Sequence, residues 1–96
     1  MTKLEKDVER LLVRNVEQAG GQCLKWVSPG WSGVPDRIVL LPGGVIAFVE
    51  LKRPEGGRVS ALQLYWAEKL QALGFKWYLI RNSADVWRFM EDVINE

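Results

Sequence analysis

Residues 33–54 read GVPDRIVLLPGGVIAFVELKRP, and this stretch decides the fold. Two apolar segments, 37–41 and 45–51, flank the PGG sequence at 42–44, which is typical of the tight turn of a β-hairpin. Both segments carry apolar residues at successive positions, so each strand has two apolar faces. Because such strands need cover on both sides, the sequence predicts a hairpin at the centre of a sheet with helices on both faces.

The sequence around the hairpin supplies one helix before it and two helices after it. Residues 3–19 carry apolar residues at helical spacing and are followed by two glycines. Ser60 and Gln63 match a capping box at the start of a helix that ends near residue 73. The other predicted elements are strands over 23–27 and 75–81 and a last helix over about 84–94, capped by Ser83. The order is helix, three strands, helix, strand, helix, which indicates one α/β domain spanning residues 1–96.

The composition limits the chemistry that the chain can perform. The 96 residues are 48% hydrophobic and 26% charged, with a net charge of +1, so any basic site must be local. The absence of histidine excludes a Ser-His-Asp triad and histidine-bound zinc, and the single cysteine excludes a disulfide framework and a four-cysteine metal site. No apolar run reaches the roughly 20 residues of a membrane span, and the N-terminus has no apolar signal core. We expect a cytoplasmic protein that contacts no membrane and uses carboxylates, lysines or arginines, with oxygen-bound metals.

Three polar residues meet at one end of the predicted hairpin. If Leu41 pairs with Val45, the numbers of paired residues sum to 86, which sets Asp36 directly opposite Glu50. Glu50 and Lys52 lie two residues apart, so they share a face of the strand. Two carboxylates so close together must share a proton or bind a cation, and Mg²⁺ is a cation that such a pair of carboxylate ligands can bind. The pattern indicates a cation site beside a lysine, which suits hydrolysis of a phosphodiester.

GVPDR at 33–37 and FVELKRP at 48–54 resemble the signature of the PD-(D/E)xK nucleases. With the S-x-LQ pattern that begins at Ser60, the whole chain more narrowly resembles the virus-type replication-repair nuclease (VRR-NUC) domain, in its stand-alone phage or prophage type. The resemblance implies a restriction-endonuclease-like core with a central mixed four-stranded sheet flanked by helices (α-β-β-β-α-β-α). It also implies an Mg²⁺- or Mn²⁺-dependent DNA endonuclease that acts on branched DNA such as Holliday junctions or flaps, forms a homodimer and works in a bacterial or phage-infected cell.

The resemblance also implies roles for single residues. Asp36 and Glu50 would bind the metal together with the backbone carbonyl of Leu51, and Lys52 would be the catalytic lysine. Members of the family usually add a glutamate from the first helix. Here Glu9 is the favoured candidate, because Glu5 is already explained as the capping-box partner of Thr2.

Several residues have two interpretations at this point. Gln63 either caps its helix or contacts the metal site, and the pattern favours neither. Residues 20–60 carry five basic and three acidic residues, and Lys25, Arg53 and Arg58 are the candidates for contacts to the DNA backbone. Trp31 either stacks on an unpaired base or covers an edge of the core.

Two other functions fit the same sequence. The chain could be a non-catalytic DNA-binding or assembly module that retains a nuclease fold, although the complete set of Asp36, Glu50 and Lys52 argues against this. It could also be a restriction-type endonuclease that cuts linear duplex DNA at one sequence. Cleavage of different DNA structures with and without a divalent cation separates these functions.

Overall fold

The computed structural model describes residues 3–94, whose elements follow the predicted order. They are α1 (Lys3–Gln18), β1 (Gln22–Lys25), β2 (Arg37–Leu41), β3 (Val45–Leu51), α2 (Ala61–Ala72), β4 (Lys76–Ile80) and α3 (Ser83–Ile94). Both strands of the hairpin have the predicted bounds, and the other elements begin and end within two residues of theirs. The α/β class is therefore confirmed. Thr2, half of the predicted first capping box, lies outside the described residues.

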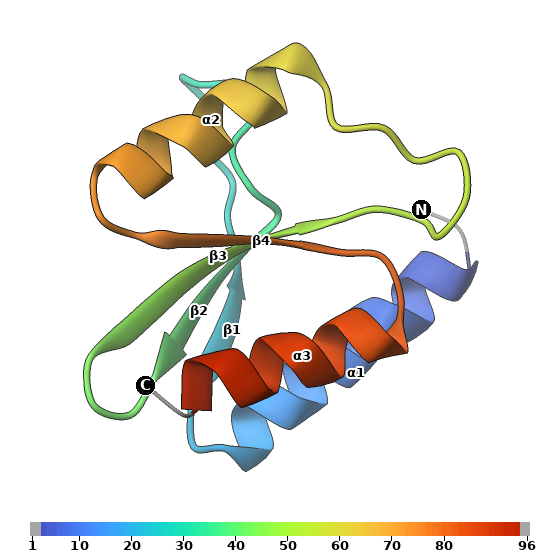
Figure 1. Ribbon diagram of the computed structural model, residues 1–96, viewed down its shortest axis with the longest axis vertical. Coiled ribbons are helices and arrows are strands. Elements are labelled where there is room, and N and C mark those ends of the chain that lie inside the picture. The colour runs from blue at the N-terminus through green and yellow to red at the C-terminus, as the bar shows by residue number, and fades with distance from the viewer. Residues whose placement is uncertain (1–2, 95–96) are drawn as a thin grey trace.

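The strands form one mixed sheet in the order β1-β2-β3-β4. β1 and β2 pair antiparallel, as do β2 and β3, whereas β3 and β4 pair parallel. A parallel pair needs a crossover connection, and α2 provides it. Figure 1 shows α1 and α3 side by side on one face of the sheet and α2 on the other. The hairpin is therefore central in the sheet, as predicted.

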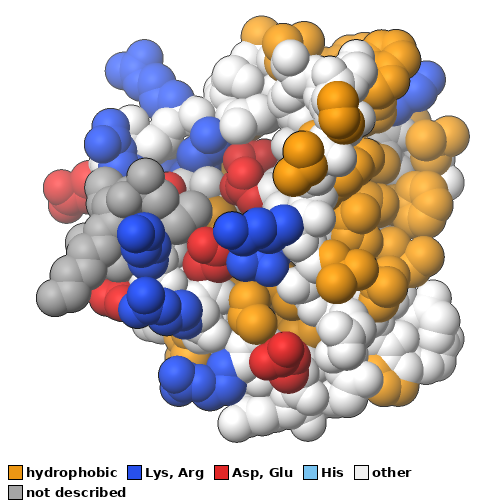
Figure 2. Space-filling view, turned by 180° about the vertical axis from the view of Figure 1, so that it is seen from behind, with side chains coloured by type: hydrophobic (Ala, Val, Ile, Leu, Met, Phe, Trp, Pro, Cys, Tyr) orange, Lys and Arg blue, Asp and Glu red, His pale blue; other side chains and the backbone are white. Residues whose placement is uncertain are grey.

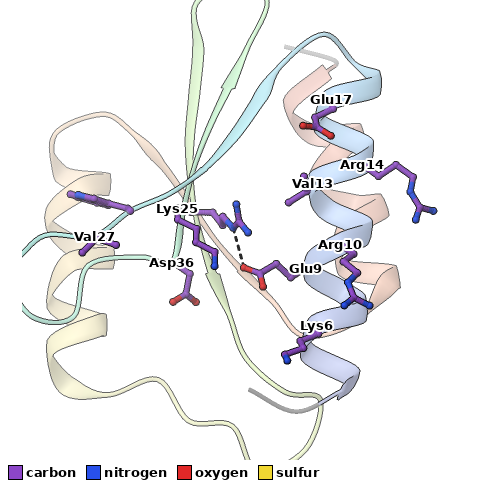
Figure 3. A pocket seen from close by; sticks show the side chains of 11 residues that line it. Lys6, Glu9, Arg10, Val13, Arg14, Glu17, Lys25, Val27 and Asp36 are labelled. Atoms are coloured by element: carbon purple, nitrogen blue, oxygen red, sulfur yellow. Dashed lines mark hydrogen bonds and ion pairs between the residues drawn. The ribbon is translucent and has the colours of Figure 1, made fainter.

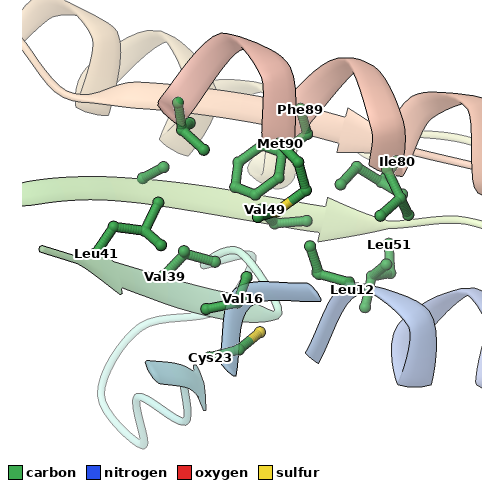
Figure 4. Packing of buried hydrophobic residues seen from close by; sticks show 13 residues of the cluster. Leu12, Val16, Cys23, Val39, Leu41, Val49, Leu51, Ile80, Phe89 and Met90 are labelled. Carbon is green, nitrogen blue, oxygen red and sulfur yellow. The ribbon is translucent and has the colours of Figure 1, made fainter. Parts of the chain in front are cut away.

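The main core lies between the sheet and the pair of helices α1 and α3 (Figure 4). Leu12 and Val16 of α1 are fully buried, and they meet Val39 and Val49 of the sheet in the same cluster as Phe89 of α3. Fully burying an aliphatic or aromatic side chain of this size contributes about 1.5–3 kcal/mol. This core fixes the position of the hairpin relative to α1. None of the described helices is both long enough and apolar enough to cross a membrane.

The opposite face of the sheet is covered only in part. α2 packs against β4, and apolar side chains toward β1 keep much of their surface exposed. Leu40 and Ile46, a directly opposed pair, are 37% and 39% exposed. Together with Leu24 and Phe75 they form what we call the sheet patch. The predicted cover on both faces is thus incomplete within the single chain. Figure 2 shows hydrophobic side chains gathered on one side of the molecule, and basic side chains around acidic ones on the other.

The helix ends follow local capping rules, with one correction. α1 stops at Gly20, whose φ of 86° suits glycine and which lets the Gly21 N–H donate to the Val16 carbonyl. The prediction that Ser83 caps α3 is wrong, because the side chain of Asn82 accepts the hydrogen bond from the Asp85 N–H at 2.9 Å. Asn is as good an N-cap as Ser, so Ser83 becomes the first residue of the helix.

Candidate active site

The hairpin register brings Asp36 and Glu50 together. Leu41 pairs with Val45 and Arg37 with Val49, which confirms the predicted register and sets Asp36 opposite Glu50 one position further on. The N–H of Leu51 donates to Asp36 Oδ2 at 2.8 Å. This bond fixes the Asp36 side chain against the end of β3, where the side chain of Glu50 interacts with it.

Glu50 is the one charged residue that is buried among the side chains that the structure describes, with 1% of its surface exposed. Burial, and then the close approach and negative charge of the Asp36 carboxylate, raise the pKa of Glu50 to about 8, against a smaller opposing effect of Lys52. Its Oε1 atom is buried and has no hydrogen-bond partner. A buried carboxylate oxygen in this position is costly to ionise unless a cation or a proton compensates it.

The other carboxylate oxygen of Glu50 is held from two sides. Gln63 Nε2 donates to Glu50 Oε2 at 3.1 Å, and Lys52 Nζ lies 3.8 Å from the same oxygen. Gln63 is at the same time the partner of the N-cap Ser60 in the capping box of α2, because its Oε1 accepts from the Ser60 N–H and its own N–H donates to Ser60 Oγ. The two interpretations of Gln63 therefore hold together: one amide caps the helix and orients Glu50.

These residues fit a divalent cation. Asp36 and Glu50 offer carboxylate oxygens, which Mg²⁺ and Mn²⁺ prefer, and the unpartnered Oε1 is available for a metal. A third carboxylate is not adjacent, since residues 3–94 hold no cluster of three or more Asp, Glu, His or Cys side chains that could bind a metal. The carbonyl of Leu51 stays the predicted third protein ligand.

Comparison with known proteins places this geometry in a family. No family model matches the chain. "Putative nuclease p44" of Acyrthosiphon pisum secondary endosymbiont phage 1 is 44% identical over 82 residues, which cover 85% of this chain and 86% of that protein. A solved structure of a VRR-NUC domain superposes with a TM-score of 0.87 and 31% identity, covering 94% of this chain and 97% of the other. The chain belongs to the VRR-NUC family. The predicted family and its four-stranded mixed sheet are thereby confirmed.

In this VRR-NUC domain the helix glutamate is engaged by an arginine. Glu9 Oε2 accepts from Arg37 Nε at 3.0 Å, and Arg37 Nη1 donates to the Cys23 carbonyl at 2.9 Å. Asp36 and Arg37 both line the groove that contains Glu9, and the carboxylate of Glu9 is turned to Arg37 (Figure 3). Glu5, the alternative ligand, lies one turn earlier on α1. A metal-binding role for either glutamate stays a prediction.

The four predicted DNA contacts fall in three places. Lys25 is exposed beside Asp36 and lines the groove that contains Glu9. Arg53 and Arg58 are exposed on the 53–59 loop that follows the site. Trp31 is 66% exposed and meets Trp66 edge to face at 5.9 Å. Trp31 thus combines packing at the edge of an aromatic cluster with a free surface.

Arg81 is a supporting residue that the sequence did not reveal. Its Nη1 donates to the carbonyls of Gly57 at 2.8 Å and Arg53 at 3.2 Å, so it ties β4 to the loop that carries the two predicted arginine contacts. Gly33 allows the loop before Asp36 to pack closely against α2. A Cβ at this position would lie 2.8 Å from the backbone of Leu62. Both contacts join segments far apart in sequence, and no local pattern signals them.

Proposed function

We propose that this VRR-NUC domain is an Mg²⁺- or Mn²⁺-dependent endonuclease that hydrolyses phosphodiester bonds in branched DNA. The observation that carries the proposal is the buried Glu50 with its unpartnered Oε1, next to Asp36 and Lys52. Membership of the family and the relative named as a nuclease support the same activity. Branched DNA is favoured because a small domain of this kind has little surface for reading bases and recognises backbone shape.

Each residue of the site has a distinct task in this proposal. Asp36, Glu50 and the Leu51 carbonyl would hold the cation, which when bound supplies positive charge to the phosphate and lowers the pKa of water. Lys52 donates from its ammonium group to the attacking water or to the phosphate oxygens, where charge develops. Gln63 holds Glu50 Oε2 and thereby fixes the direction of Oε1. Glu9 holds Arg37 at the start of β2 and positions the strand that carries Asp36.

Cleavage of a panel of labelled DNAs tests the function. Single strand, duplex, flap, splayed arm and four-way junction are incubated with the protein in Mg²⁺, Mn²⁺ or EDTA. We expect cutting of the branched DNAs with either metal and none in EDTA. DNA binding without cutting in every metal would mean a non-catalytic module, and cutting of plain duplex at one sequence would mean a restriction-type enzyme. Either outcome contradicts the proposal.

We also propose that the chain acts as a homodimer through the sheet patch. A four-way junction needs two symmetric cuts, and one domain has one candidate site. The sheet patch lies next to α2, which exposes Leu62, Leu64 and Tyr65 and ends at the exposed C-cap Leu73. An exposed apolar surface of this extent is typical of an interface, and a second copy would cover it.

A charge in the centre of the sheet patch should prevent dimer formation. Leu40→Glu places a carboxylate on a residue that is 37% exposed, so the single chain can fold with the new side chain in water. Sedimentation equilibrium should give twice the 11.0 kDa chain mass for the wild type and the chain mass for the variant. Trp87→Glu is the control, because Trp87 is an exposed apolar residue of α3, outside the patch. A monomeric wild type, or dissociation by Trp87→Glu alone, would refute this interface.

A further inference from the structure

A groove that is lined in part by Asp36 of the candidate active site runs along α1 (Figure 3). It has a volume of about 820 Å³ and is bordered by α1, by the end of β1 and by the start of β2. The main-chain N–H of Trp26 donates to the Asp36 carbonyl at 3.0 Å, so the wall of the groove is joined directly to the first carboxylate of the site. A chain that lies in this groove therefore reaches Asp36, one of the two carboxylates of the site.

The groove has a surplus of available positive charge. Five of its eleven lining residues are basic and three are acidic, and one acid, Glu9, is already paired with Arg37. Lys6 and Arg10 follow each other by one helical turn on α1, about 6 Å apart along its axis. Arg10 pairs with the exposed Asp7 at 3.7 Å, and an exposed pair of this kind contributes little and gives way to a phosphate. Lys25 faces them from β1.

The groove also has an apolar side, which a phosphate backbone alone would leave without a contact. Val27 is 79% exposed within it, and Val13 and Trp26 line it as half-buried neighbours. A DNA duplex presents phosphates outward and keeps its bases stacked inside, so it would meet the lysines and arginines but leave these side chains in water. An unpaired strand offers both phosphates and base faces, which is the combination that single-strand binding grooves recognise.

We infer that this α1 groove binds an unpaired strand of the DNA substrate and leads it to the phosphate at Asp36 and Glu50. The inference rests on the proposed nuclease function and adds that, among branched DNAs, those with a single-stranded segment next to the cut bind most tightly. The part of α1 from Lys6 to Glu17 is about 16 Å long, which suits roughly two or three nucleotides of an extended strand. Lys6 and Arg10 bind its phosphates, and Val27 lies against its bases.

Fluorescence anisotropy with a labelled oligothymidylate of about twelve nucleotides, and a duplex of the same length, tests the groove in EDTA. Wild type should bind the single strand more tightly than the duplex. Lys6→Gln and Arg10→Gln should each weaken single-strand binding about fivefold near 0.1 M salt and lower the slope of log affinity against log salt by about 0.7. Val27→Asp should weaken the single strand more than the duplex. Arg88→Gln, which removes an exposed charge on α3, should change neither.

The outcomes separate the groove from the catalytic assignment. Equal affinity of wild type and the groove variants for the single strand, or an equal loss for both DNAs, would overturn the groove even if the enzyme cuts branched DNA. If no DNA is cut in any metal but the groove variants behave as expected, the nuclease function fails and the binding site stands. Circular dichroism and thermal unfolding confirm that each variant is folded, and all four substituted side chains are exposed.

Discussion

Replacing Lys52 with alanine is expected to lower the rate of DNA cleavage at least about a hundredfold while changing DNA affinity by no more than about a factor of two. The Lys52 ammonium lies 3.8 Å from Glu50 Oε2 and its side chain is 18% exposed, so it sits at the rim of the carboxylate pair, where a phosphate would arrive. Its positive charge is needed where negative charge develops in the transition state, and little of that charge exists in the bound substrate. Single-turnover cleavage of a labelled flap or junction gives the rate, and anisotropy in EDTA gives the affinity.

Two further variants make this result specific. Lys52→Met keeps the length of the side chain and removes only the charge, so it should lose as much activity as Lys52→Ala. Lys69→Ala removes an exposed lysine from the last turn of α2 and should cut like the wild type. Thermal unfolding in Mg²⁺ shows whether the Lys52 variants fold. Cleavage by a folded Lys52→Ala protein at the rate of the wild type would mean that the catalytic lysine is assigned wrongly.

The pairing of Asp36 with Glu50 could be predicted because it depends only on local rules. The three residues at 42–44 form a tight turn, and the length of this turn fixes every pair of the hairpin. The capping box of Ser60 and Gln63 is equally local and is present as expected. What the sequence left open was whether Gln63 has a second partner. That depends on where α2 lies above β3, which tertiary packing decides.

Glu9 shows the limit of the same reasoning. Its position beside the apolar stripe of α1 could be predicted, and α1 does place it at the end of the sheet near Asp36. The partner of Glu9 could not be predicted, because Arg37 is 28 residues away in sequence. The two side chains meet only when α1 packs against the sheet. Lys25 of the α1 groove was predicted as a DNA contact, whereas Lys6 and Arg10 were missed for a similar reason. On α1 alone, Lys6 and Arg10 resemble an ordinary solvated helix face, and only Lys25 and Asp36 opposite them make a groove.

Glu50→Gln should make the metal-free protein more stable than the wild type near pH 8 and leave it about equally stable near pH 5. In the folded chain the pKa of Glu50 is about 8, because the carboxyl is buried beside Asp36, whereas in the unfolded chain it is ordinary at 4.5. The folded state thus retains a proton that the unfolded state releases between these pH values. The contribution of Glu50 to the free energy of unfolding of the wild type is therefore highest below pH 4.5 and decreases as the pH rises to 8. The loss is on the order of 3–5 kcal/mol.

A neutral amide removes this pH dependence, and with it the response to metal. For a domain of this size 3 kcal/mol corresponds to more than about 10 °C in melting temperature, which thermal unfolding at pH 5 and pH 8 in EDTA resolves easily. Mg²⁺ or Mn²⁺ should restore much of the lost stability of the wild type at pH 8, because a cation compensates the ionised pair of Asp36 and Glu50. Neither ion should stabilise Glu50→Gln to the same extent. Glu68→Gln, an exposed substitution on α2, should follow the wild type in every condition.

This experiment separates a metal site from a carboxyl that is merely buried. Both would make the wild type less stable at pH 8 than at pH 5, since both raise the pKa of Glu50. Only a metal site makes that loss reversible by Mg²⁺ or Mn²⁺, and only at a pH where the proton has left. The unpartnered Oε1 of Glu50 requires this behaviour if a cation is its intended partner. A wild type that loses stability at pH 8 and regains none of it in millimolar Mg²⁺ or Mn²⁺ would show that the pair holds a proton and not a metal.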